Sequence, residues 1–317
     1  MRKNTTWDCG RSTADGFALF ERTLWQAMRK TAYWLAIDIG GSSVKVALWD
    51  GHRLSRVDRT EFGSAIVDGD WIARLLGLKL QAWGDPPIRS AAVGVPSLVD
   101  AKHRVVVESA NLGWRNYPLA SVLRKALRIP VYLETDVLLA ARVESALGAG
   151  RNSTDFVYIN LGTGVSHVRM LRGEPQLGAH GLGTNLGHAP LFSGRNRRAR
   201  KLCRCDRPYC VETVIGGRVI ATALRRWRGG ERHRFWREYG ENLGIVLSCV
   251  TSLLDPERIV LNGGVCASRT LFESSMRAAL QRHTAHQGAL PKILFSRLGD
   301  AAGLVGAGLA AQQRAHE

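Results

Sequence analysis

The first strong pattern along the chain is an apolar run that stops at two glycines and then resumes. Residues 35–39 are apolar except for Asp38, and residues 40–43 read Gly-Gly-Ser-Ser. From residue 44 onward apolar and polar positions alternate, with Lys45 on the polar side. The pattern predicts a tight β-hairpin with a glycine-rich tip.

Hydrophobic periodicity then predicts alternating strands and helices through the first half of the chain. Strands are expected where apolar residues form short runs, and helices where they recur every three or four positions. The predicted elements are a strand at 53–62, a helix at 71–83, a strand at 88–99 broken at Gly94 and Pro96, a helix at 119–127, a strand at 131–134 and a helix at 137–147.

The pattern starts again in the second half. A strand at 156–161 ends at Gly-Thr-Gly (162–164), and a second strand returns at 165–171. Further on we expect a helix at 239–254, a strand at 258–261, a helix at 268–283, a strand at 292–295 and a terminal helix at 301–314. Two similar halves, each with a glycine turn, predict a cleft between them that holds a nucleotide.

The tip of the first hairpin has the chemistry of a phosphate site. Glycines let backbone N–H groups approach an anion, and Ser42, Ser43 and Lys45 add donors and a positive charge. Asp38, directly before the turn, is suited to hold Mg²⁺ or its waters. The alternative is an ordinary hairpin in which the glycines serve only the turn.

Composition bounds the class of protein. With 317 residues, 45% hydrophobic and 22% charged, the chain can form one large or two medium globular domains. No apolar run reaches the roughly 18 residues of a membrane span, and the N-terminus lacks a leader pattern, which favours a cytoplasmic protein. Residues 1–32 fit poorly with the rest; we treat 1–27 as an extension of unknown order, with Met28 as a candidate start.

A net charge of +17 raises the question of a nucleic-acid partner. Residues 195–237 contain 14 Lys or Arg against Asp206, Glu212 and Glu231, and therefore carry +11 of that total. The region has no helix-turn-helix pattern and little aromatic interleaving. We expect a solvated Arg-rich face around a metal loop, and no nucleic-acid or membrane partner.

Three of the six cysteines, Cys203, Cys205 and Cys210, fall within eight positions. Six cysteines in a chain of this length do not resemble a disulfide framework. The cluster therefore favours a metal site.

Seven short motifs occur in the order typical of one known family. They are Asp38-Ile39-Gly40-Gly41, the turn Asn111-Leu112-Gly113-Trp114, Glu134-Thr135-Asp136, Gly162-Thr163-Gly164, Gly187-His188, Cys203-Arg-Cys205 to Cys210-Val-Glu212, and Asp255-Pro256 to Gly263-Gly264. From about residue 33 to its end, the chain resembles the ROK proteins (repressors, open reading frames, kinases). These are sugar kinases and sugar-responsive repressors.

The resemblance implies the actin-like ATPase (RNase H-like) fold, with two α/β lobes around a nucleotide and sugar cleft. We expect residues 33–136 to form the first lobe and residues 137–300 the second, with a zinc loop at 188–210. The C-terminal helix, within 301–317, is expected to pack back on the first lobe. A homo-oligomer, dimer or tetramer, is expected on the same ground.

The resemblance also implies roles for single residues. Asp136 matches the catalytic base that accepts a proton from a sugar hydroxyl as it attacks the γ-phosphorus of ATP, although its place before a helix also suits an N-cap. Asp38 matches the residue that organises Mg²⁺. The residues expected to hold ATP are Gly40, Gly41, Ser42, Ser43, Lys45, Gly162, Thr163, Gly164, Gly263 and Gly264. The residues expected to contact the sugar are Asn111, Thr135, Asp136, Asn185, His188 and Glu212.

A structural zinc ion is expected on His188, Cys203, Cys205 and Cys210. Three thiolates and one imidazole complete a tetrahedral shell with no open position, which is typical of a structural site. The second ring nitrogen of His188 would face the sugar and couple the metal to the substrate pocket. The alternative is four unrelated residues.

Several positions depart from the family pattern. Thr135 stands where Asn is usual, and Asn185 where a carboxylate is usual. Asp206, Tyr209 and Ser97 replace expected glycines. Since the first two positions contact sugar hydroxyls in the family, a lost charge-assisted bond of about 1.5–3 kcal/mol leaves the identity of the sugar open.

Two functions from different classes follow. The first is an ATP-dependent hexose kinase acting on glucose or a related hexose or amino sugar. The second is a non-catalytic sugar-binding regulatory protein, although the 32 residues before the hairpin are too few for the winged helix of the family's repressors. Polyphosphate bound on the Arg-rich face as the phosphoryl donor ranks below both.

Overall fold

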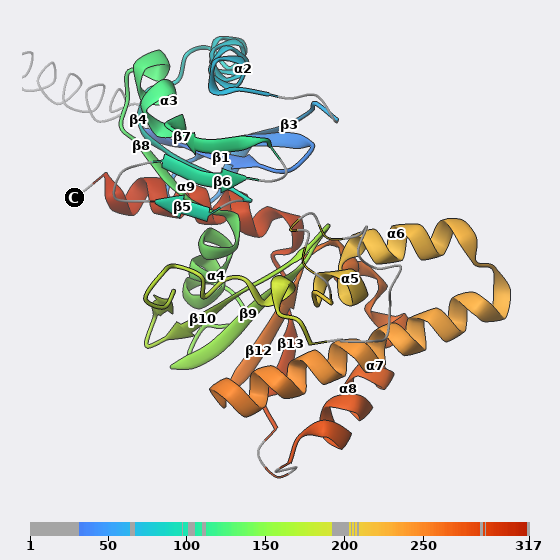
Figure 1. Cartoon of the computed structure of the whole chain (residues 1–317). Helices are drawn as coiled ribbons and strands as arrows, with labels where there is room; N and C mark the ends of the chain where they lie inside the picture. The colour runs from blue at the N-terminus through green and yellow to red at the C-terminus, as the bar shows by residue number, and fades with distance from the viewer. Residues whose placement is uncertain are drawn as a thin grey trace, which may run out of the picture.

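The structure is a computed structural model, and it describes residues 32–63, 67–96, 98–100, 105–109, 112–191, 203, 205, 207, 209–285, 288 and 290–315. The predictions for the N-terminal extension, for Asn111 and for the departures at Ser97 and Asp206 fall outside the described residues. The chain forms two α/β lobes, as expected (Figure 1).

A mixed five-stranded sheet forms the first lobe. Its strands, in spatial order, are β3 (Leu54–Glu61), β2 (Ser43–Trp49), β1 (Tyr33–Ile39), β4 (Ile88–Val95) and β8 (Val131–Thr135). β1 and β2 form the predicted antiparallel hairpin, in which Asp38 lies opposite Lys45. β4 and β8 run parallel to β1, so the carboxyl ends of all three strands meet at one edge of the sheet.

The second lobe repeats this sheet. Its strands, in spatial order, are β11 (Glu174–Gln176), β10 (Val165–Leu171), β9 (Asp155–Leu161), β12 (Arg258–Asn262) and β13 (Lys292–Phe295). β9 and β10 form an antiparallel hairpin, and β12 runs parallel to both β9 and β13. The two sheets therefore have the same strand order, which confirms the internal duplication predicted from the two glycine hairpins.

Helix α9 (Ala302–Arg314), the last element of the chain, lies under the sheet of the first lobe (Figure 1). It packs against β1, β4 and α4 (Asp136–Ala146), and Leu304 and Ala307 are buried with Trp49 and Leu139. A side chain on Gly306 would overlap the backbone of Leu139, so the glycine is required for this close approach. α9 thereby joins the first sheet to the helix that begins at Asp136.

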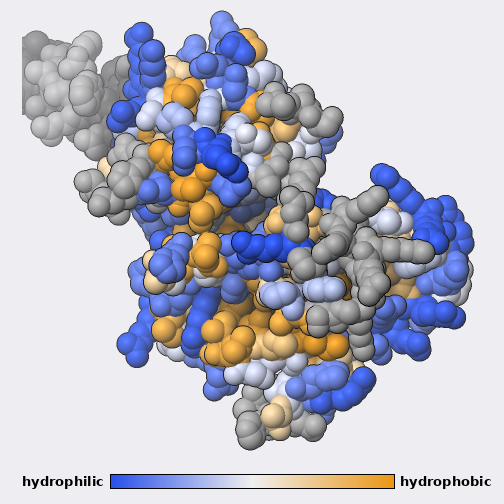
Figure 2. Space-filling model, in the orientation of Figure 1, coloured by the Kyte–Doolittle hydropathy of each residue, from blue (hydrophilic) through white to orange (hydrophobic). Residues whose placement is uncertain are grey.

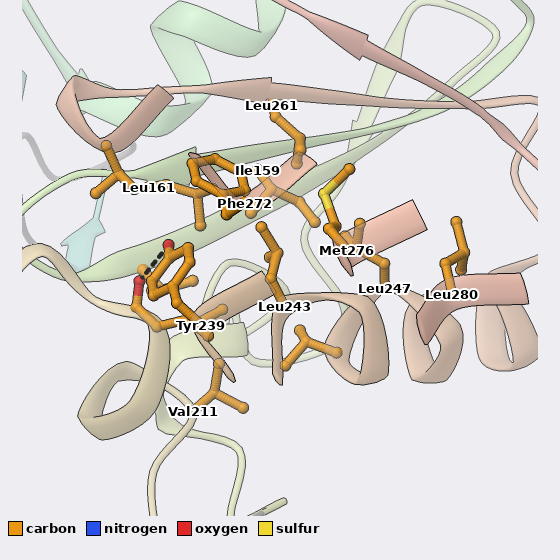
Figure 3. Packing of buried hydrophobic residues seen from close by; sticks show 14 of the residues in the cluster. Ile159, Leu161, Val211, Tyr239, Leu243, Leu247, Leu261, Phe272, Met276 and Leu280 are labelled. Atoms are coloured by element: carbon orange, nitrogen blue, oxygen red, sulfur yellow. Dashed lines mark hydrogen bonds between the residues drawn. The ribbon is translucent and has the colours of Figure 1, made fainter. Parts of the chain in front are cut away.

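Helices α7 (Gly229–Leu254) and α8 (Arg269–His283) cover one face of the second sheet, and α4 covers the other. Tyr239, Leu243 and Leu247 of α7 pack with Ile159 and other strand residues (Figure 3). Glycines at 240 and 244 let α7 approach the backbone of α8 closely. α7 begins ten residues earlier than predicted. The prediction missed its first turns because they are exposed and lack an apolar stripe.

The sequence also missed several short elements. Three strands, β5 (Leu98–Asp100), β6 (Val105–Ser109) and β7 (Trp114–Tyr117), form a small separate sheet. Two short helices, α5 (Glu212–Ile215) and α6 (Gly217–Arg226), precede α7. The two predicted helices of the first half, α2 (Gly69–Ala82) and α3 (Leu119–Leu127), cover the first sheet. None of the helices in the described ranges combines the length and apolarity that a membrane span requires.

Candidate functional site

The first hairpin brings a carboxylate and an amine together below its tip. Asp38 and Lys45 lie directly opposite each other on β1 and β2, with Lys45 Nζ 3.6 Å from Asp38 Oδ2. Nζ also donates a hydrogen bond to the carbonyl oxygen of Asp300, at 3.1 Å. Burial raises the pKa of Asp38, and the nearby Lys45 charge opposes that rise.

Asp136 lies beside Asp38 because of the parallel register of three strands. Gly94 of β4 pairs with Asp38 on one side and with Glu134 on the other, and Asp136 follows β8 directly as the first residue of α4. A Cβ on Gly94 would lie 3.6 Å from Asp136 Cα and 3.7 Å from Asp38 Oδ1. The two carboxylates therefore flank a position without a side chain.

The Asp136 carboxyl group holds its proton more tightly in the folded protein than it would in water. Burial, and then the charge of Asp38, raise its pKa from 3.8 to about 7. Its Oδ1 accepts a hydrogen bond from the N–H of Val137 at 2.7 Å, which partly offsets the rise. Across the described ranges, no side chain donates a hydrogen bond to this carboxylate. Asp136 is the first residue of α4, and the N-cap is Thr135, which makes no side-chain cap bond, so the N-cap interpretation of Asp136 was wrong.

Thr135, the residue before Asp136, has an unsatisfied polar atom. Its Oγ1 is buried and finds no hydrogen-bond partner among the residues that the structure describes. Burying a hydroxyl without a partner costs about 1–3 kcal/mol. Such an atom at the end of β8, next to a buried carboxylate, is suited to a ligand hydroxyl.

Hydrogen bonds from α5 and α6 hold the second glycine turn, Gly162 to Gly164, in place. The N–H of Gly217 donates to the carbonyl oxygen of Gly162 at 2.8 Å, and Glu212 accepts from the N–H of Val165 at 3.1 Å. A side chain on Gly164 would overlap the Glu212 carboxylate. Glu212, which the resemblance assigned to the sugar, thus also supports the turn.

The third glycine pair, Gly263 and Gly264, follows β12. Gly263 has φ 101° and lies against the backbone of Leu161, where a Cβ would overlap, whereas Gly264 has open space around its Cα. The preceding Asn262 donates to Tyr158 Oη at 2.9 Å and to the carbonyl oxygen of Gly299 at 3.1 Å. The end of β12 is therefore hydrogen-bonded to Gly299, at the start of the C-terminal segment.

Sequence reasoning missed the contribution of that segment to the first hairpin. Asp300 binds Lys45 through its carbonyl oxygen, and a Cβ on Gly303 would lie 3.2 Å from Asp38 Oδ2. The resemblance predicted that the terminal helix packs on the first lobe, but no local pattern indicated its contacts with Lys45 and Asp38. Gly299 and Asp300 together link the site around Asp38 with the turn after Asn262.

The four predicted metal ligands lie together. One ligand atom from each of His188, Cys203, Cys205 and Cys210 lies within 4.8 Å of the others. Sγ of Cys203 is 3.4 Å from His188 Nδ1 and 3.1 Å from Cys205 Sγ, and Cys205 Sγ is 3.4 Å from Cys210 Sγ. This donor set fits a structural Zn²⁺ ion, with Nε2 of His188 left free of the cluster. Burial raises the pKa of Cys210 to about 11, so metal binding must displace its proton.

His188 is held beside the second glycine turn. It ends the short helix η1 (Leu186–His188), whose first N–H donates to Nδ1 of His167 at 3.2 Å. A Cβ on Gly187 would overlap the carbonyl oxygen of Val165, so η1 packs directly on β10. Asn185 directly precedes η1. His188, a member of the Cys₃His cluster, therefore lies in a segment that packs on β10 next to Gly164.

The predicted residues thus form two groups. Asp38, Lys45, Thr135 and Asp136 lie together in the first lobe around the tip formed by residues 40–43. The residues that gather in the second lobe are Gly162, Thr163, Gly164, Asn185, His188, Glu212, Gly263 and Gly264. The C-terminal segment is bonded to both groups.

Residues 34–314 match the model of the ROK family. A glucokinase from Halalkalibacterium halodurans is 24% identical over 89% of this chain and 96% of its own length. A xylose repressor from Bacillus spizizenii is 21% identical over 96% of this chain and 83% of its own. The fold is similar to the crystal structure of a ROK family glucokinase from Streptomyces griseus in complex with glucose and AMPPNP. The TM-score is 0.74 at 23% identity, and the match covers 89% of this chain and 100% of that chain. This similarity confirms the actin-like ATPase fold. Since the family model matches nearly its whole length, this chain belongs to the ROK family.

Proposed function

We propose that this protein is an ATP-dependent sugar kinase that phosphorylates a hydroxyl of a hexose or a related amino sugar. The observation that carries the proposal is the Asp136 carboxylate, whose pKa is raised to about 7 beside Asp38. A general base works best when its pKa lies near the working pH. Sugar-kinase relatives, among them the glucokinase that is 24% identical, support the same activity.

In this proposal Asp136 takes the proton from the attacking sugar hydroxyl. Lys45, held by Asp38 and by the carbonyl of Asp300, places a positive charge at the tip of the first hairpin. Backbone N–H groups of the two glycine turns bind the phosphates from opposite lobes. Bound Mg²⁺ supplies neutralisation of the phosphate charge, and Asp38 is the residue suited to hold it or its waters.

The sugar is expected to contact Thr135, Asn185 and His188. The unpartnered Oγ1 of Thr135 offers one donor and acceptor to a sugar hydroxyl. Asn185 has one oxygen that accepts hydrogen bonds and an amide nitrogen that donates them, whereas a carboxylate at this position could accept from two sugar hydroxyls. The proposal therefore names a hexose-type substrate and leaves its stereochemistry to the assay.

A coupled ADP-release assay tests the proposal. Mg-ATP is supplied with glucose, mannose, fructose, N-acetylglucosamine, N-acetylmannosamine or allose in turn. Turnover is expected with at least one sugar and is expected to be lost in Asp136→Asn, which keeps the hydrogen-bond acceptor for Val137. Equal turnover in the variant would contradict the assignment of the base.

A second function has support of its own. The xylose repressor relative spans most of this chain, and two predicted sugar contacts, Thr135 and Asn185, are substituted. A non-catalytic sugar-binding regulator would bind a sugar, as measured by calorimetry, and would release no ADP with any member of the panel. Sugar-dependent ADP release that requires Asp136 excludes this alternative.

A further inference from the structure

A groove on the second lobe lies outside the proposed active site. It is a cavity of about 470 Å³ between α7 and α8, and these helices cover the sheet face opposite α4. Arg234 and Arg237 of α7 line it together with Arg282 and His283 at the end of α8. Figure 2 shows hydrophilic residues gathered over the outer part of α6 and α7. Part of the Arg-rich region found in the sequence therefore lines a concave site.

The arginines of the groove have no ion-pair partner in the part of the chain that the structure describes. The side chains of Arg234, Arg237 and Arg282 form no ion pair or hydrogen bond with any described residue. They are exposed, and two of them are one helical turn apart on the same face of α7. Guanidinium groups arranged in this way favour a phosphate, which accepts several N–H donors at once.

The remaining lining is suited to hydroxyl groups. Glu238, Glu241 and Asn242 continue the same face of α7 into the groove. Asn242 is only 8% exposed and lines the groove, and its amide is not one of the described buried polar atoms that lack a hydrogen-bond partner. An amide can both accept and donate a hydrogen bond, so at this place in the groove it is suited to a ligand hydroxyl. Carboxylates and an amide together are the groups that bind neighbouring sugar hydroxyls.

We propose that this groove binds a sugar phosphate, with the phosphate on the three arginines and the sugar hydroxyls on Glu238, Glu241 and Asn242. Its volume lies within the range of small-ligand sites, roughly 300–1,000 Å³. The two carboxylates disfavour a longer polyanion such as nucleic acid, because they would repel its backbone along the groove. The inference concerns binding alone and does not rest on the proposed kinase activity.

Isothermal titration of the zinc-loaded full-length protein with glucose 6-phosphate tests the proposal. We expect two binding events in total if the active-site cleft also binds this ligand, and one otherwise. The double variant Arg237→Gln/Arg282→Gln is expected to lose one event or to weaken it at least tenfold, since two charge-assisted contacts are removed. Arg225→Gln is the matched control, because this exposed arginine of α6 does not line the groove.

Three outcomes would overturn the proposal. Unchanged binding in the double variant would place all binding in the active-site cleft. An equal loss in Arg225→Gln would indicate a diffuse basic surface. Equally tight binding of inorganic phosphate and glucose 6-phosphate would show that Glu238, Glu241 and Asn242 do not contact the sugar. The proposal instead expects Asn242→Leu to weaken the binding of glucose 6-phosphate and to leave the binding of inorganic phosphate unchanged. Circular dichroism of each variant separates lost binding from lost folding.

Discussion

Replacing Asp136 with asparagine is expected to stabilise the folded protein, by an amount that grows as the pH rises towards neutral. The carboxylate must be ionised above pH 7, in a position where burial and the charge of Asp38 disfavour its charge. Asparagine has nearly the same shape and still accepts the hydrogen bond from Val137, but it carries no charge. The variant for which the proposed function predicts a loss of turnover should therefore gain stability.

The size of this gain follows from the pKa of Asp136. The value rises from 3.8 in the unfolded chain to about 7 in the folded protein. At about 1.36 kcal/mol per pKa unit, the upper limit is about 4 kcal/mol, and the partial exposure of the residue makes about 2–4 kcal/mol a fair expectation. A raised carboxyl pKa means that wild-type stability is fully present below about pH 4 and falls as pH rises towards 7. The advantage of the variant should grow over the same window and then level off.

Urea unfolding of both proteins between pH 5.5 and 8.5 measures this difference. The gap in unfolding free energy should widen up to about pH 7 and then level off, and the Cys₃His cluster is the same in both proteins. Asp38→Asn supplies a second check, because removing the neighbouring charge should move the titration of Asp136 to lower pH. A gap that is independent of pH, or a variant that is less stable at pH 8, would refute the account of Asp136 as a carboxylate with a raised pKa.

Three further predictions concern other parts of the site. Gly164→Ala should lower the melting temperature and abolish nucleotide binding in calorimetry, because its Cβ would overlap Glu212, whereas Gly77→Ala, in open space on α2, should stabilise by about 0.5–1 kcal/mol; equal effects of the two changes would contradict the argument. Thr135→Val should raise the stability of the sugar-free protein by about 1 kcal/mol, by removing an unpartnered hydroxyl, while weakening sugar binding by calorimetry; unchanged sugar affinity would exclude Thr135 from the pocket. Cys205→Ser should reduce bound zinc, measured by elemental analysis, from one ion per chain to a small fraction and lower the melting temperature, and full retention of zinc would show that the cluster is not the site.

The regular elements were predictable where a local pattern and a chain break coincide. The first hairpin, the strand β9 with its glycine turn, and α8 were predicted within one or two residues. In each case an apolar run ends at glycines or at a clear change of periodicity, so neighbouring residues alone specify the element. The similarity of the two halves was predicted from the repeated hairpin, whereas the equal strand order of the two sheets, which includes the unpredicted β11, came from the structure.

Other elements escaped prediction because distant contacts stabilise them. The start of α7 is exposed and Arg-rich, and the strands β5, β6 and β7 contain only three to five residues each. Such short strands acquire their hydrogen bonds from one another and show no periodicity long enough to detect. The groove of Arg237 and Arg282 likewise depends on the packing of α7 against α8.

The sequence by itself determined the chemical groups: the carboxylates Asp38 and Asp136, the glycine turns and the Cys₃His metal ligands. Only the tertiary structure decided how these groups act on one another. The parallel register across Gly94 brings the two carboxylates together and raises the pKa of Asp136, and the C-terminal helix places Gly303 against Asp38. Burial and the proximity of charges depend on contacts between residues that are far apart along the chain, and no local pattern encodes those contacts.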